Sequence, residues 1–274
     1  MNLLQSLLIV AAVTAVAVGS MLVVRRGAPE GSRFRDGDRA AGVFGVVATG
    51  FSVLLGFIIF LAFQAYDDTR AGAETEATVL AQMVQTAQLM PGGSSEELTG
   101  ELICYGRSVV GTEWEAVAAG SLQDSINPWG AQMFRTVAAL EPSTNSEQSA
   151  YERWMQQTAD RQQARNDRVH TAAGIIPTPL WVGLYLICFV IFGYLLLFAD
   201  RAEGAFTQSV LMGSVAVVIT VLMLLLGFFD NPHGEGIGGL QPTAMERSLR
   251  IVDTQLEALG VTLTPPCDER GVAR

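Results

Sequence analysis

Residues 40–66 read AAGVFGVVATGFSVLLGFIIFLAFQAY and contain no charged side chain. The hydrocarbon core of a bilayer is about 30 Å thick, and a helix rises about 1.5 Å per residue, so roughly 20 apolar residues cross it. Three other stretches also lack charge, at residues 1–24, 179–199 and 208–229. Four such stretches in one chain predict four transmembrane helices, arranged as two hairpins.

The first stretch is interpreted as a retained span and not as a cleaved signal peptide. Residues 1–5 contain no basic side chain, and no cleavage pattern of small residues precedes Arg25 and Arg26. No stretch shows the alternation of a β-strand, so the chain is expected to be all-α. Its expected parts are an N-terminal transmembrane hairpin at 1–66, an extramembrane helical region at 67–178, a C-terminal transmembrane hairpin at 179–229 and an extramembrane tail at 230–274.

The charges are unevenly placed and predict an orientation. Link 25–39 carries five arginines against three acidic residues, whereas region 67–178 carries fifteen acidic residues and seven arginines, a net charge of −8. Short basic loops stay in the cytoplasm, and long segments cross largely regardless of their charge. We therefore expect a multi-pass protein of the plasma membrane, with both termini and the acidic central region outside the cell.

The second span is expected to continue beyond the membrane as one helix. Only Gly72 weakens the helical sequence between Tyr66 and Met90, and Pro91-Gly92-Gly93 is the first firm stop. Apolar residues recur along one stripe of this extension, at Ala73, Ala77, Leu80, Val84, Ala87 and Met90.

Three later helices have recognisable starts. The capping box, a Ser or Thr followed three residues later by Glu, occurs at Ser94 with Glu97 and at Thr144 with Glu147. These boxes predict helices from 94 to about 119 and from about 146 to 173. Asn127 followed by Pro128 predicts a third, shorter helix that runs to about residue 140.

The extension of the second span leaves the membrane at Tyr66. The helix that is predicted to end near residue 173 meets the membrane on the same side. If they pair antiparallel, Arg165 and Arg168 face Glu74 and Glu76. Our hypothesis is a cross-helix charge network that holds the two hairpins in register. The alternative is a set of independent solvated charges, because exposed ion pairs contribute only ~0–1 kcal/mol.

The second span also carries the candidate pore residues. Its glycines, among them Gly50 and Gly56, allow close helix packing in lipid, which is favoured over a pore-lining role. Phe57, Phe60 and Phe63 follow near its outer end. A ring of such side chains from several subunits can gate a pore by dewetting, but a lipid-facing aromatic group at the interface is the favoured interpretation.

Catalytic, metal and cofactor sites find little support in the sequence. The two histidines, His170 and His233, lack neighbouring ligands at metal spacing, and no nucleophile or phosphate-binding motif is present. No basic cluster suits nucleic acid. Because no span contains a charged residue, coupled transport is also disfavoured. We therefore expect no enzyme and no cofactor, with the lipid bilayer and a second copy of the chain as partners.

The cysteines leave one question open. Cys188 lies inside the third span and is expected to serve packing. Cys104 and Cys267 both fall outside the membrane in this topology, in a compartment that permits disulfides. They either pair, which would tie the tail to the central region, or remain separate.

Three segments together resemble the bestrophin-like domain family of bacterial multi-pass membrane proteins. They are GF at 56–57 with YDDTR at 66–70 and EA at 76–77, ARNDRV at 164–169 with Pro177 and LW at 180–181, and DNP at 230–232 with PTAM at 242–245. The resemblance implies the layout of two plus two spans. It also points to the bestrophins, which are pentameric anion channels with an all-helical body.

The leading functional hypothesis is a homo-oligomeric passive ion channel with the second span nearest its axis. The resemblance implies permeation by anions, whereas the acidic outer region favours cations. The alternative is a non-conducting membrane scaffold or accessory protein that binds another envelope component. For Asp230 and Pro232, a simple cap of the fourth span is preferred to a functional role.

Overall fold

The computed structural model describes residues 2–29, 33–34, 36–91, 93–121, 127–171, 174–234 and 238–274. Over these ranges the chain forms nine α-helices and one π-helical turn and contains no strand, which confirms the all-α fold. The chain divides into two compact units. Unit 1 comprises Met1–Ala65 and Gly174–Gly238, and unit 2 comprises Tyr66–Ala173 and Gly239–Arg274.

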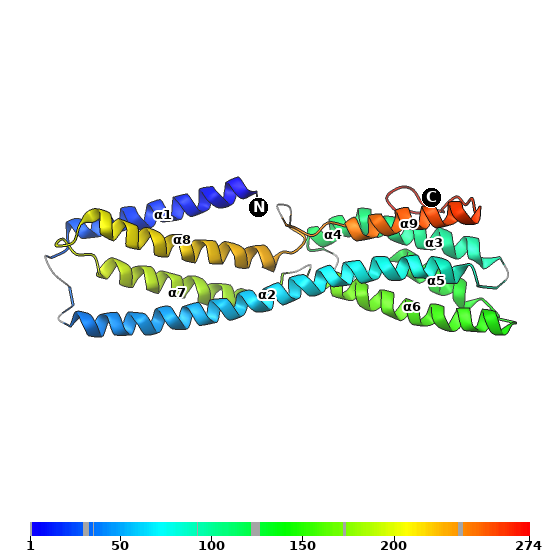
Figure 1. Ribbon diagram of the computed structural model, residues 1–274, viewed down its shortest axis with the longest axis horizontal. Coiled ribbons are helices and arrows are strands. Elements are labelled where there is room, and N and C mark those ends of the chain that lie inside the picture. The colour runs from blue at the N-terminus through cyan, green and yellow to red at the C-terminus, as the bar shows by residue number, and fades with distance from the viewer. Residues whose placement is uncertain are drawn as a thin grey trace. The chain divides into compact units, whose positions relative to one another are not determined.

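Unit 1 contains the four predicted membrane spans (Figure 1). Each is long and apolar enough to cross a bilayer, which confirms the two-plus-two layout. The helices concerned are α1 (Leu3–Arg26), the first part of α2 (Gly37–Ala87), α7 (Thr178–Leu197) and α8 (Ala205–Asp230).

The spans of unit 1 pack through regular apolar stripes. Phe51, Leu55, Ile58 and Ala62 recur every three or four residues on α2, so they share one side of the helix and contact α7 and α8. On α1, Ala17 and Met21 pack against α8 in a second cluster. Most of the remaining large side chains of these helices are exposed, as expected for surfaces that meet lipid or another subunit.

Asp230, the last residue of α8, binds the segment that leads into α7. Its Oδ1 accepts hydrogen bonds from the backbone N–H groups of Ile175 (2.9 Å) and Ile176 (2.7 Å), and its Oδ2 accepts one from the indole of Trp181 (3.1 Å). The preferred interpretation of Asp230 as a simple cap of the fourth span was therefore wrong. Three donors at the start of α7 offset the unfavourable position of a carboxylate at a helix C-terminus.

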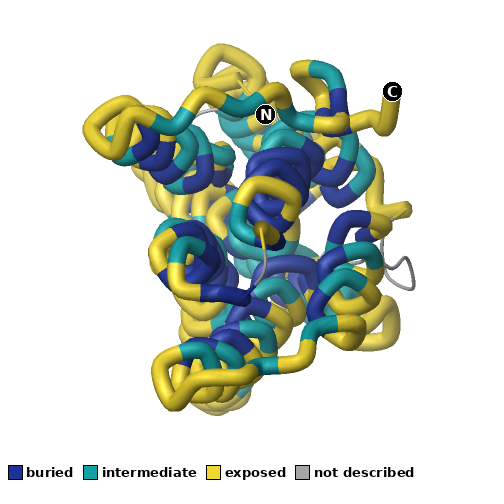
Figure 2. Tube along the Cα trace, turned by 90° about the vertical axis from the view of Figure 1, so that its right-hand side faces the viewer, coloured by how far each residue is buried: buried dark blue, intermediate teal, exposed yellow. Residues whose placement is uncertain are grey.

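Unit 2 is a helical body with its own apolar core. It consists of the second part of α2, α3 (Ser94–Ser108), the π-turn η1 (Val109–Glu113), α4 (Trp114–Ala118), α5 (Pro128–Ala138), α6 (Asn145–Val169) and α9 (Thr243–Leu259). Buried residues such as Leu80, Leu102 and Trp154 belong to this core. The outer sides are largely exposed (Figure 2).

The continuation of the second span as one helix is confirmed, because α2 runs unbroken to Ala87. Ala77, Leu80, Val84 and Ala87 of the predicted stripe are all buried in the core of unit 2. The helix ends three residues earlier than expected, in turns that bring the N–H groups of residues 89 and 90 back to the carbonyls of residues 86 and 87. Residue 92 of the predicted stop lies outside the described residues.

All three predicted helix starts are confirmed, but the predicted capping contacts are right in only two cases. Asn127 caps α5 by accepting from the N–H of Trp129, and Thr144 and Glu147 form the full capping box of α6. The box predicted at Ser94 is wrong. Gly93, with a positive φ of 78°, holds the cap position, and the Ser94 hydroxyl donates to the carbonyl of Pro91 instead.

The open question about the cysteines has an answer, because Cys104 and Cys267 form a disulfide with their Cα atoms 5.7 Å apart. The bond joins α3 to the tail that follows α9. The two cysteines are 163 residues apart, so the chain-entropy account assigns the bond roughly 4–5 kcal/mol of stabilisation.

Candidate functional site

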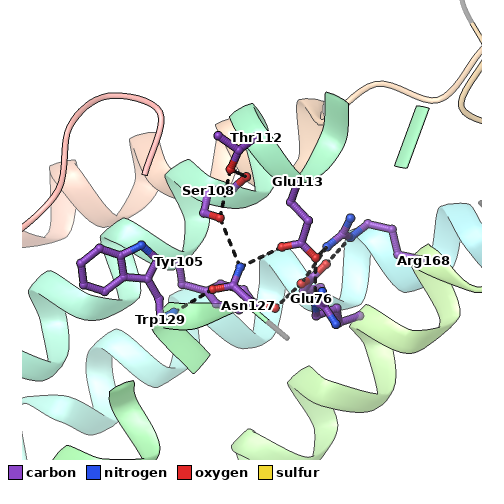
Figure 3. A network of polar contacts seen from close by, with 9 residues as sticks. Glu76, Tyr105, Ser108, Thr112, Glu113, Asn127, Trp129 and Arg168 are labelled. Carbon is purple, nitrogen blue, oxygen red and sulfur yellow. Dashed lines mark hydrogen bonds and ion pairs between the residues drawn. The ribbon is translucent and has the colours of Figure 1, made fainter. Parts of the chain in front are cut away.

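Four charged side chains from three elements meet in the interior of unit 2. Figure 3 shows Glu76, Glu113 and Arg168 among them. Arg168 of α6 donates from Nε to Glu76 of α2 over 2.5 Å and from Nη2 to Glu113 of η1 over 3.1 Å. Arg165, one turn earlier on α6, donates to the same oxygen of Glu113 over 2.6 Å. Glu76 and Arg168 are completely buried and Glu113 nearly so. We call these four residues the charge cluster.

The π-turn explains how Glu113 reaches the charge cluster. A π-turn contains one more residue per turn than an α-helix, so it rotates the side chains that follow it. Val109 and Glu113, at the two ends of η1, are both buried, which places the carboxylate inside unit 2 and not on its surface. Such turns occur often at functional sites, and this one supplies one of the two carboxylates of the cluster.

Neutral polar groups complete the coordination of both carboxylates. The Tyr105 hydroxyl of α3 donates to Oε1 of Glu76. The amide of Asn127 donates to Glu113 over 2.8 Å and to the hydroxyl of Ser108 over 3.3 Å (Figure 3). Since Asn127 also caps α5, this one residue fixes both the start of a helix and the position of Glu113.

The pKa values reflect the balance between burial and pairing. Burial favours the neutral form of Glu113, but Arg168 and Arg165 outweigh it and hold the pKa of this carboxyl below its usual range. Burial opposes the charge of Arg168, yet Glu76 and Glu113 raise the pKa of its guanidinium. Burial, and then the charge of Glu76, raise the pKa of Tyr105 well above its usual value, so its phenol stays protonated. The shifts therefore favour a charged Glu113 and a charged Arg168 beside a neutral phenol.

Gly72 lets α2 and α6 approach closely enough for these contacts. A Cβ atom at this position would lie 2.8 Å from the carbonyl oxygen of Ala164 and 2.9 Å from the backbone nitrogen of Arg168. Both obstacles are backbone atoms, which cannot rotate away. The residue that weakens the helical pattern in the sequence is thus the one that this helix crossing requires.

The structure brings together some of the residues expected in the charge network and separates others. Glu76 and Arg168 pair directly. Glu74 is exposed and pairs with Arg70 on its own helix, over 3.2 Å. Arg165 contacts Glu113 instead of Glu74. The expected Glu74 contribution is corrected accordingly, because Glu74 lies on the solvent side of α2, two residues from the inward-facing Glu76.

The residues expected to line a pore or a helix interface lie on the other unit, on the exposed side of α2. Phe57 and Phe60 are exposed, and a Cβ atom at Gly50 or Gly56 would meet no atom of the described residues within 4 Å. These two glycines therefore do not serve a close helix crossing within the chain. Phe63 is also largely exposed but makes an edge-on ring contact with Phe229 of α8.

Sequence reasoning missed Tyr105, Glu113 and Asn127. A signal existed for Glu113, which is a single charge within the otherwise apolar run VVGTEW at 109–114. Asn127 was assigned only its capping role. Within the described ranges no group of three or more histidine, cysteine or acidic side chains is placed to hold a metal ion. The charge cluster acts chemically as a fixed, internally neutralised joint between α2, η1 and α6.

Comparison with known proteins gives one family and one fold. The family description "Bestrophin-like domain" matches residues 11–243. No curated protein matches the sequence. Variants of the bacterial bestrophin homologue from Klebsiella pneumoniae have similar structures. One shares 13% identity with a TM-score of 0.66 over 94% of this chain and 98% of its own. Another shares 13% identity with a TM-score of 0.67 and covers 93% of this chain and 98% of its own. A structure described as a membrane protein shares 12% identity with a TM-score of 0.67 and covers 95% of this chain and 99% of its own.

Proposed function

The chain belongs to the bestrophin-like domain family, and from this membership we propose that it is a homo-oligomeric, passive ion channel of the bacterial plasma membrane. In this proposal the exposed side of α2 in unit 1 lines the path of the ions. The similar solved structures support the fold of such a protein, and the properties of α2 itself support the role.

The observation that carries the proposal is the division of α2 into two opposite sides. Phe51, Leu55 and Ile58 face α7 and α8. We call the opposite side of the helix the open face. It consists of Gly42, Gly45, Val46, Thr49, Gly50, Val53, Gly56, Phe57 and Phe60, all exposed. Helical spacings of three, four and seven residues place them together.

The open face differs in composition from the lipid-facing sides of the other spans. Among the described residues of the four spans, all exposed glycines lie on α2. The exposed residues of α7 include Val182, Leu186 and Phe189, which are large and suited to acyl chains. A side with small residues allows several copies of α2 to surround a narrow axis, and the glycines leave room there for water and ions.

Phe60 lies on the line of the open face and is the proposed constriction. A ring of aromatic side chains blocks ions by dewetting when it is narrow and admits them when it widens. The apolar stretch 40–66 of α2 contains no Asp, Glu, Lys, Arg or His. Because coupled transporters place such groups at depth, we propose passive conduction.

The disulfide supports an orientation for the channel. Disulfides persist in oxidising compartments, so the bond between Cys104 and Cys267 favours unit 2 on the outer side of the membrane. The arginines of link 25–39 favour the cytoplasm for the opposite ends of the spans. There Arg25 donates to the carbonyls of Asp200 and Glu203, over 3.1 Å and 2.5 Å, and so fixes α1 to the loop between α7 and α8.

The proposal is tested by ion flux through the purified protein in liposomes, with chloride and potassium gradients measured separately. We expect flux under at least one gradient, and a several-fold increase for Phe60→Ala because the constriction widens. Phe189→Ala, an exposed phenylalanine on α7, is the matched control and should leave flux unchanged. Liposomes that stay tight under both gradients, with the protein inserted, would instead favour the scaffold that binds another envelope component.

A further inference from the structure

Arg161 of α6 is a buried guanidinium without an anionic partner in the part of the chain that the structure describes. Only 4% of the residue is exposed, and the ion pairs of the neighbouring Arg165 and Arg168 do not include it. Its charge lies over the ring of Tyr105, 4.3 Å from the centroid, and its buried Nε has no acceptor. A cation–π contact is weaker than an ion pair, so this buried charge requires a further partner.

The charges around Arg161 do not balance. Two carboxylates, Glu76 and Glu113, are shared among three guanidinium groups, those of Arg161, Arg165 and Arg168. Arg165 and Arg168 occupy both carboxylates. Among the residues that the structure describes, one positive charge is therefore left over in the interior, and it belongs to Arg161.

The guanidinium of Arg161 also ends beside the first turn of α5. A Cβ atom at Gly130, the third residue of this 11-residue helix, would lie 3.6 Å from both Nη1 and Nη2. A helix N-terminus carries a partial positive charge, so it repels a guanidinium and attracts the same anions. The N–H of Gly130 already donates to the carbonyl of Asn127. Gly130 therefore offers no free hydrogen-bond donor, and α5 contributes the electrostatic field of its N-terminus.

Gln157 adds a second polar group without a partner. It precedes Arg161 by four residues, so the two side chains share one side of α6. The residue is 5% exposed, and neither its Nε2 nor its Oε1 has a hydrogen-bond partner among the described residues. Buried amides are almost always hydrogen-bonded, so an orphaned amide next to an orphaned guanidinium indicates a missing ligand.

We propose that Arg161, Gln157 and the first turn of α5 bind one small monovalent inorganic anion, of which chloride is the probe. Arg161 supplies the charge, Nε2 of Gln157 supplies a second donor, and the helix N-terminus supplies a favourable field. A single negative charge balances the single excess positive charge. The near-complete burial of both side chains suits an ion of this size and not a phosphorylated organic molecule. The ion is held within unit 2 and does not depend on conduction through unit 1.

The test is the thermal unfolding midpoint of the full chain in detergent, measured in mixtures of sodium chloride and sodium gluconate at constant ionic strength. A ligand that binds only the folded state raises the midpoint in a saturable way. We expect this rise for the wild type and for Arg153→Met, which removes an exposed arginine of the same helix. Arg161→Met should show no chloride response.

Two further results make the outcome decisive if Arg161→Met does not fold. Gln157→Leu, which keeps the charge, should still respond but require several-fold more chloride. Crystals soaked in bromide should show an anomalous peak within hydrogen-bond reach of the guanidinium of Arg161. A wild-type midpoint that ignores chloride, an unchanged response in Arg161→Met, or bromide-soaked crystals without this peak would overturn the proposal and leave water as the partner.

Discussion

Nε of Arg168 donates to Oε2 of Glu76 over 2.5 Å, and both side chains are fully withdrawn from solvent. The pair joins α6 to α2 at the level where Gly72 brings the two backbones together. Burying two charges is costly, and their attraction offsets this cost only when the remaining donors and acceptors are satisfied. Here Tyr105 and Glu113 supply much of that coordination.

We expect Arg168→Met to destabilise the folded protein by about 3–5 kcal/mol, because it leaves two buried carboxylates without their shared cation. Denaturant unfolding of the full chain, followed by helical circular dichroism, measures this loss. The double variant Glu76→Leu with Arg168→Met should lose less than the sum of the two single variants. Strict additivity would mean that the two residues do not act as a pair.

Acid should weaken unit 2 through Glu113. Its pKa is lowered in the folded protein despite burial, so its contribution to stability is present above its unfolded pKa of about 4.3 and is lost as the pH falls through the folded value. Unfolding midpoints between pH 7 and pH 3 should therefore fall more steeply for the wild type than for Glu113→Gln. Parallel curves for the two proteins would contradict this role.

Glu101 should behave in the opposite way. Burial raises the pKa of its carboxyl, an effect that Thr136 only partly offsets, and no described residue forms a hydrogen bond with its Oε2. The protonated form is favoured in the folded state, so stability is lost as the pH rises through the folded pKa. Glu101→Gln should therefore raise the unfolding midpoint at pH 7 and change it little at pH 4. A lower midpoint at pH 7 would show that the ionised carboxylate has a partner.

Gly72→Ala should destabilise unit 2 by about 1–3 kcal/mol, because its Cβ atom meets backbone atoms of α6 that cannot move aside. Gly50→Ala is the matched control on the same helix, where a Cβ atom meets nothing within 4 Å. That change should leave the unfolding midpoint unchanged or slightly higher, since alanine is the better helix former. Equal effects at the two positions would argue against the close crossing.

The disulfide predicts the labelling pattern of intact cells. After treatment with a reductant that does not cross the membrane, a membrane-impermeant maleimide should label Cys104 and Cys267, while the buried Cys188 stays unlabelled. Labelling that appears only after the cells are opened would place unit 2 in the cytoplasm. Cys104→Ala should also cost about 2–5 kcal/mol of stability.

Much of the fold can be predicted from residue patterns within single segments of the sequence. Charge-free stretches long enough to cross a bilayer predicted all four spans, and the stripe through Leu80 and Val84 predicted the continuation of α2. The antiparallel pairing of α2 with α6 also predicted that Arg168 faces Glu76. Residues at equal distances from the membrane lie opposite one another in such a pair.

Other features of the fold and the site depend on local geometry that a regular pattern of side chains every three or four residues does not reveal. The π-turn at Val109–Glu113 adds a residue to one turn, so a regular 3.6-residue pattern cannot predict that Glu113 points inward. Asp230 finds its donors near Ile175, far from its own position in the sequence. At Ser94 the capping pattern was present, but the left-handed Gly93 already formed the helix start.

The most direct test of conduction along α2 is the block of single-channel current by a water-soluble thiol reagent. Val53→Cys places a thiol on the open face, where Val53 is 69% exposed, and Val182→Cys on α7, 60% exposed, is the control. Both are made with Cys188→Ala, and the disulfide protects the other cysteines. We predict that the reagent blocks the current of Val53→Cys and leaves that of Val182→Cys intact. Block at Val182 alone, or at neither position, would contradict an ion path along the open face.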